Sequence, residues 1–90
     1  MILNTTVKFG YSVPWRAIHE TLIKAAQATN GVVAEPPPFV LQTSLNDFCV
    51  SYEINAYTDQ PNKAKIIYSE LHQNIQDLCN QADIDMTAKN

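Results

Sequence analysis

The side chains of this chain that most readily act as bases, nucleophiles or metal ligands are two histidines and two cysteines. His19 and Glu20 begin like a zinc-binding H-E-x-x-H helix, but Ile23 stands where the second histidine belongs. His72 and Cys79 are seven positions apart, which is two helical turns and too far for simple chelation. Because tetrahedral zinc needs four nearby ligands, we predict no metal and no cofactor, and we interpret both histidines as surface or rim residues.

Carboxylate pairs for general acid–base catalysis are equally hard to find. Asp83 and Asp85 flank a predicted helix-to-strand junction, and Glu53 is isolated on the polar side of its strand. A catalytic pair must converge in a cleft, and this spacing indicates no such convergence. The chain has only two glycines and therefore lacks a phosphate-binding loop, so we predict that it is not an enzyme.

The charge distribution argues against a nucleic-acid partner. The formal net charge is −3, and the six lysines and arginines are scattered along the chain. No basic stripe follows a phosphate backbone. Aromatic side chains that would otherwise stack on bases are therefore interpreted as packing and interface residues. These are Tyr11, Tyr52, Tyr57 and Tyr68.

Cysteine usage and hydropathy predict a soluble domain in a reducing compartment. Cys49 lies in a strand pattern and Cys79 in a helix pattern, so we interpret both as reduced cytoplasmic thiols, with a disulfide as the alternative. The first three apolar residues are followed at once by polar ones, and no apolar run approaches the ~20 residues that span a bilayer. We expect the 90 residues to form one domain with its ordered core over residues 5–86.

The segment Pro36–Tyr57 contains two strand patterns on either side of the polar break Asn46-Asp47. In the second pattern the apolar residues fall on alternate positions, namely Phe48, Val50, Tyr52, Ile54 and Ala56. The first pattern alternates one set, Phe39, Leu41, Thr43 and Leu45, with another, Val40, Gln42, Ser44 and Asn46. Period two puts alternate residues on opposite faces of a strand. The segment therefore predicts an antiparallel hairpin with one apolar face that needs a cover.

The flanking patterns supply that cover. A strand is predicted over residues 5–11, with Gly10 marking a bulge or a close backbone approach. A helix is predicted from Pro14, with Ser12 as its N-cap, and it ends at Asn30-Gly31. A second helix is predicted over residues 62–82 and a short strand over 84–86. This order predicts a ferredoxin-like βαββαβ sandwich of the α+β class, with two helices on one face of an antiparallel sheet.

Two local features have both a structural and a functional interpretation. Trp15 beside Arg16 suits a cation–π contact or an anion site at a helix start. The interpretation that we favour is a large core residue followed by a solvated charge. Pro36-Pro37-Pro38 suits an aromatic groove on a partner, but a single triplet is more typical of a rigid connector, here a polyproline-like arm into the hairpin.

Three segments match a known pattern: VKFGYSVPWRAIHETLIKAA, EPPPFVLQTSLNDFCVSYEINAY and IYSELHQNIQDLCNQADIDM. Over about residues 4–86 the chain resembles the C-terminal cytoplasmic region of MscS-type small-conductance mechanosensitive channels. The residues that carry the resemblance are Gly10, Tyr11, Pro14, Trp15, Arg16, Pro36, Pro37, Pro38, Tyr68 and His72.

The resemblance implies a membrane channel that is gated by bilayer tension and built as a homoheptamer. It further implies that this chain is the α/β domain of the vestibule on the cytoplasmic side of the inner membrane, a cage with side openings for ions and small solutes. The family's pore and gating residues belong to membrane helices and have no counterpart here. The family usually continues into a closing segment, whereas this sequence stops at Thr87–Asn90, so we expect a closing contact between subunits to be missing.

A different class of function stays open because this fold serves many activities. A stand-alone small-ligand or regulatory module predicts a concave pocket lined by Trp15, Tyr52 and Tyr57. An acylphosphatase-like enzyme would need an arginine in a phosphate-binding loop. Arg16 instead follows Pro14 at a helix start, so we set that class aside.

Overall fold

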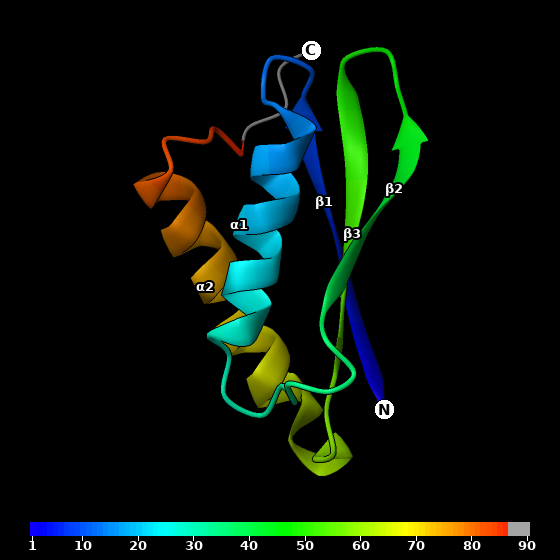
Figure 1. Ribbon diagram of the computed structural model, residues 1–90, viewed down its shortest axis with the longest axis vertical. Coiled ribbons are helices and arrows are strands. Elements are labelled where there is room, and N and C mark those ends of the chain that lie inside the picture. Colours follow the sequence, from blue (N-terminus) through cyan, green and yellow to red (C-terminus); the bar gives the residue numbers. More distant parts are fainter. Residues whose placement is uncertain (87–90) are drawn as a thin grey trace.

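The computed structural model describes residues 1–86 and contains an antiparallel sheet with two helices on one face (Figure 1). The elements in chain order are β1 (Ile2–Gly10), α1 (Trp15–Gln27), β2 (Phe39–Leu45), β3 (Cys49–Tyr57), a 3-10 turn (Pro61–Lys63) and α2 (Ala64–Gln81). The strand order is β1-β3-β2, so β3 is central and pairs antiparallel with both neighbours. The predicted α+β arrangement, with both helices over one face of an antiparallel sheet, is confirmed.

The short last strand that the sequence predicts does not form. Residues 84–86 have no regular secondary structure, so the sheet of residues 1–86 has three strands. Asp83, which follows the C-cap Ala82 of α2, takes a left-handed conformation with φ 58°. The Ile84 N–H then donates to the Cys79 carbonyl at 2.8 Å, and the Ile84 side chain is buried in the core. The polar end that the sequence predicts at 87–90 lies outside the described residues.

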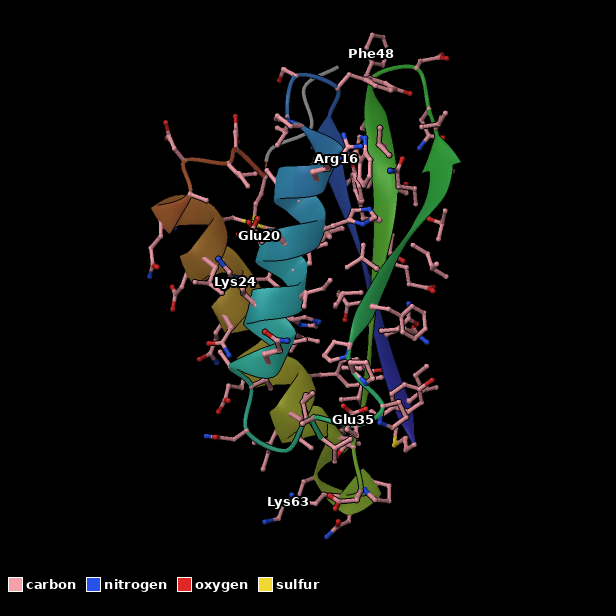
Figure 2. All side chains as sticks on the ribbon, viewed as in Figure 1. Arg16, Glu20, Lys24, Glu35, Phe48 and Lys63 are labelled. Atoms are coloured by element: carbon pink, nitrogen blue, oxygen red, sulfur yellow. The ribbon has the colours of Figure 1, made fainter. Side chains whose placement is uncertain are left out.

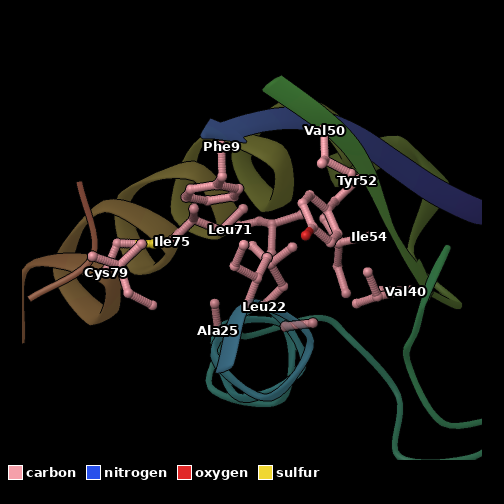
Figure 3. Packing of buried hydrophobic residues seen from close by; sticks show 14 residues of the cluster. Phe9, Leu22, Ala25, Val40, Val50, Tyr52, Ile54, Leu71, Ile75 and Cys79 are labelled. Atoms are coloured by element: carbon pink, nitrogen blue, oxygen red, sulfur yellow. The ribbon is translucent and has the colours of Figure 1, made fainter. Parts of the chain in front are cut away.

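The core lies between the sheet and the two helices (Figure 3). The sheet contributes Leu3, Phe9, Val40, Val50, Tyr52, Ile54 and Ala56, and the helices contribute Ile18, Leu22, Ala25, Ala26, Ile67, Leu71, Ile75 and Cys79. Each large apolar side chain stabilises the fold by about 1.5–3 kcal/mol through the area that it removes from water. The strand periodicity of β3 thus predicts its buried face, with Phe48 as the exception, because that residue lies in the turn before β3.

The irregularity predicted at Gly10 occurs elsewhere. Gly10 pairs regularly with Cys49, and a Cβ placed on it would meet nothing within 4 Å. The register instead shifts in β2, between Gln42 and Ser44. An extra residue in one strand changes which face the following side chains occupy. Leu45 is therefore paired with Val50, a residue of the helix-covered face, rather than with a residue of the opposite face.

The first helix begins without the predicted side-chain cap. Its N-cap is Pro14 rather than Ser12, and the Pro14 carbonyl accepts hydrogen bonds from the N–H groups of Ala17 and Ile18 at 3.1 and 3.2 Å. Proline suits this place because the missing N–H has no helical partner in any case. After α1 the chain turns at Gly31, whose φ is +96°. The helix therefore ends earlier than the predicted Asn30-Gly31, at Gln27 with Ala28 as its C-cap, and Gly31 takes its left-handed conformation in the turn that follows.

Candidate functional site

The reactive side chains singled out in the sequence lie apart from one another. His19, on α1, stacks edge-on between Trp15 and Tyr52, with ring centroids 5.0 and 5.6 Å away. His72, on α2, instead faces β1, where its Nε2 lies 2.9 Å from the Thr5 hydroxyl. Among residues 1–86, no group of three histidine, cysteine or acidic side chains is placed to hold a metal ion.

His19 has an unusual environment for a titratable group. Its Nε2 is buried and makes no hydrogen bond to residues 1–86. Burial lowers the pKa of His19 below its ordinary value, because the charged imidazolium is poorly solvated there. His19 is therefore half-buried, as a rim residue is, and its ring belongs to an aromatic row on the inner side of the sheet.

The two signature residues of α2 cover the free edge of β1. The Asn4 N–H donates to the Tyr68 hydroxyl at 3.1 Å, and the Thr5 hydroxyl contacts His72 one helical turn further along. An edge strand presents unpaired backbone groups that readily pair with another chain. Tyr68 and His72 therefore act structurally here, by satisfying polar groups along this edge.

Both cysteines are free thiols, as the sequence predicts. Cys79 is buried between α2 and the sheet, and burial raises the pKa of its thiol. Cys49 is half-buried at the start of β3. Buried thiols of raised pKa are unreactive, so neither the position of Cys79 nor its chemistry indicates a nucleophile.

The signature residues between β1 and α1 gather at one end of the molecule, which we call the apical end. Gly10 ends β1, and the Tyr11 hydroxyl donates a hydrogen bond to the Asn46 carbonyl in the β2–β3 turn. Pro14 precedes α1 and Trp15 begins it. Figure 2 shows Phe48, in the same turn as Asn46, at this end of the molecule.

Trp15 is not the core residue that the sequence indicates. It is 44% exposed, and the Arg16 guanidinium lies 4.3 Å from the centre of its ring. This is a cation–π geometry, so the contact forms in place of the favoured arrangement of a core tryptophan followed by a solvated charge. The contact fixes a positive charge beside an exposed aromatic surface.

An open hollow of about 290 Å³ lies beside Trp15, and we call it the apical hollow. Its lining includes Tyr11, Pro14, Trp15, Leu45 and Tyr52. The hollow exists because the bulge in β2 places Leu45 on the helix-covered face at a point that the helices leave open, so this side chain is 71% exposed. Trp15 and Tyr52 thus meet as a ligand-binding module would require. Tyr57, the third residue of that prediction, lies at the other end of β3.

Within residues 1–86, no helix or loop covers the face of the sheet turned away from α1 and α2, which we call the outer sheet face (Figure 1). Phe39 pairs with Asn55 and Leu41 with Glu53, and these four residues alternate with the buried Val40 and Ile54. Leu41 is 50% exposed, and Phe39 and Ile2 are also exposed on this face. This surface is not among the predictions from the sequence, although the alternation of Phe39 and Leu41 with Val40 is the signal that indicates it.

The proline triplet lies in the loop that leads into β2. Pro36 and Pro37 are exposed and Pro38 is buried, and the Glu35–Pro36 peptide bond is cis. The preceding residues are anchored because the Val33 N–H donates to the Tyr57 carbonyl at 2.9 Å. The triplet thus connects the first helix to the sheet through an anchored loop.

Comparison with known proteins assigns the chain to a family. No helix among residues 1–86 is long and apolar enough to cross a membrane. A search of curated proteins found no match. Residues 3–86 match the family described as "Mechanosensitive ion channel MscS, C-terminal", which covers nearly the whole chain. The chain therefore belongs to the C-terminal domain family of MscS-type mechanosensitive ion channels.

Proposed function

We propose that this chain is the cytoplasmic α+β domain of a tension-gated channel of the inner membrane. In that role it joins identical subunits into a homoheptamer and forms part of the vestibule through which ions and small solutes pass. The proposal rests on the family match over residues 3–86 and assigns no catalytic step to the domain. The reactive side chains of residues 1–86 fit this role, because they serve packing and edge protection instead of converging in a cleft.

The observation that carries the assembly role is the uncovered outer sheet face. Phe39 and Leu41 are exposed there on β2 and Ile2 on β1, the two edge strands, and the half-buried Tyr57 of β3 pairs with Ile2. Gathered exposed apolar side chains of this size mark interaction surfaces in soluble domains. A subunit contact would remove them from water, and the polar residues between them would form its hydrogen-bonding component.

Deleting residues 3–86 from the full-length channel tests the proposal. We expect the deletion to reduce both the number of subunits per particle and the tension-activated conductance in membrane patches. Native mass spectrometry measures the first quantity, and patch recording under applied suction measures the second. If both quantities are unchanged, the assigned role is wrong.

Two variants test whether the loss of assembly comes from the outer sheet face. Phe39→Ser with Leu41→Ser removes apolar area from this face, and we expect it to weaken assembly. Ile66→Ser is the matched control, because Ile66 is 70% exposed on α2, on the other side of the molecule. Equal losses of assembly in both variants would contradict the role of the outer sheet face.

A further inference from the structure

We propose that neighbouring copies of this chain meet head to tail, with Leu41 and Glu53 of one copy seated against the apical hollow and Arg16 of the next. The inference rests on the proposed assembly role and names the two surfaces that carry it. A closed ring of seven identical subunits requires each copy to present two different surfaces, since a self-complementary patch only joins copies in pairs. The outer sheet face therefore needs a second, different surface as its partner.

The apical hollow has the shape and lining of that partner. Its aromatic lining includes Trp15 and Tyr52, and Leu45 stands exposed in its wall. A hollow of about 290 Å³ has room for one leucine-sized side chain or more. Leu41 is a half-exposed apolar side chain on the outer sheet face of the edge strand β2, where it pairs with Glu53 of the central strand.

Charge complementarity reinforces this match. Glu53 lies directly opposite Leu41 across the β2–β3 pair, and Arg16 stacks over Trp15. One surface thus places an anion beside an apolar knob, and the other places a cation beside an apolar hollow. Among residues 1–86 neither Glu53 nor Arg16 belongs to an ion pair, whereas Lys24 and Glu20 already pair with each other at 2.8 Å.

The other exposed surfaces of residues 1–86 match less well. The groove between α1 and α2 is lined by Glu20 and Lys24, whose charges are satisfied within the chain. Ile66 is exposed on α2 beside the basic Lys65 and offers no hollow of aromatic lining. Within residues 1–86, the apical end alone combines a hollow lined by aromatic side chains with an unpaired positive charge, that of Arg16, which is opposite in sign to Glu53.

Disulfide trapping in the full-length channel tests the geometry. The variant carries Leu41→Cys and Leu45→Cys, with Cys49→Ser and every other accessible cysteine replaced by serine. Leu41 and Leu45 face opposite sides of the sheet, so a bond within one chain is excluded. Head-to-tail contact predicts a ladder of covalent oligomers on mild oxidation, because each chain is then joined to two neighbours.

The control variants distinguish a head-to-tail contact from a self-complementary one and from no contact. Leu41→Cys alone predicts no covalent dimer, and a dimer there would show a self-complementary contact and overturn the proposal. Leu41→Cys with Ile66→Cys also predicts no ladder. If the double variant gives no ladder while the channel keeps its subunit number, the head-to-tail contact is wrong and the assembly role stands. If the channel lacking residues 3–86 keeps both its subunit number and its conductance, the assembly role itself is wrong.

Charge exchange in the same cysteine background tests the ionic part. Arg16→Glu or Glu53→Arg alone should reduce the rate of ladder formation about tenfold or more, since each places like charges together. The two substitutions combined should restore the rate to within about threefold. Lys24→Glu is the control and should leave the rate unchanged. Single reversals without effect, or a double variant no better than the singles, would overturn the pairing of Arg16 with Glu53.

Discussion

Gly31 lies directly against Ile67, so that a Cβ placed on the glycine would stand 2.7 Å from the Ile67 Cδ1 atom. Gly31 also has φ +96°, a conformation that side-chain-bearing residues rarely adopt. The turn after α1 therefore packs against the first turns of α2 only because Gly31 has no side chain. This contact fixes where the loop toward the proline triplet leaves the helices.

Substituting Gly31 should destabilise the chain for both of these reasons. We expect Gly31→Ala to lower the free energy of unfolding by about 1–3 kcal/mol, measured by denaturant titration. Gly10→Ala is the matched control, because a Cβ there meets nothing and φ is not positive. That variant should be neutral or stabilise by up to about 1 kcal/mol. Equal destabilisation by the two variants would contradict the close contact at Gly31.

The Thr29 hydroxyl links the two helices. It donates to the Ala25 carbonyl at 2.8 Å and accepts from the Asn74 side-chain amide at 3.0 Å. Thr29→Val keeps the shape but removes both bonds, so we expect a loss of about 1–3 kcal/mol in the free energy of unfolding. Combining Thr29→Val with Asn74→Ala should cost less than the sum of the single losses. Thr6→Val, at an exposed position of β1, should change stability by less than about 0.5 kcal/mol.

Stability should fall in mild acid because of His19. Burial lowers the pKa of His19 in the folded chain below its ordinary value of 6.5, so the unfolded chain binds the proton more readily. The stability that the chain has with a neutral His19 is fully present above pH 6.5, the ordinary histidine pKa. It is lost as the pH falls from there toward the lower pKa of His19 in the folded chain. His19→Phe retains an aromatic ring between Trp15 and Tyr52 but cannot titrate.

The measurement for His19 is the free energy of unfolding between about pH 8 and about pH 5 for both chains. We expect the wild-type chain to lose more stability than His19→Phe over this range. The difference in the free energy of unfolding between the two chains should develop only below pH 6.5, the ordinary histidine pKa. Parallel pH dependence in the two chains would refute the unfavourable burial of the His19 imidazolium.

The two cysteines should react at very different rates with a thiol reagent. Cys79 is buried and its pKa is raised, whereas Cys49 is half-buried near the apical end. We expect one thiol per chain to react quickly in the folded protein, and the second only when the chain unfolds. In Cys49→Ser the fast reaction should disappear. A fast reaction that persists in this variant would mean that Cys79 is accessible.

Much of the fold follows from local patterns. The alternation in β3 and the 3.6-residue period of α2 predict the buried residues Tyr52, Ile54, Leu71 and Ile75, because period and burial are directly linked. The turn at Gly31 after the first helix follows from the conformational freedom of glycine, although the helix itself already ends at Gln27. The family resemblance, carried by ordered residues such as Pro14 and Trp15, gives the same domain as the match over residues 3–86.

The predictions that are wrong concern features that depend on tertiary contacts. The bulge in β2 and the regular pairing of Gly10 depend on how three strands fit together, which no single strand encodes. Trp15 has a helical position that suits the core, yet the bulged end of β2 leaves it half uncovered beside Leu45. The segment 84–86 has strand-like alternation but is too short to extend the sheet, and Ile84 gains more by packing into the core.

The central claim is that the outer sheet face is buried between subunits, and thiol accessibility at Leu41 tests it most directly. Leu41→Cys, in a background with Cys49→Ser, is labelled with a bulky membrane-impermeant reagent both in the isolated 90-residue chain and in the assembled channel. Labelling in the channel should be slower by about tenfold or more, because the centre of a subunit contact excludes solvent. Ile66→Cys should be labelled at similar rates in both. Equal labelling of Leu41→Cys in the isolated chain and in the channel would contradict the claim.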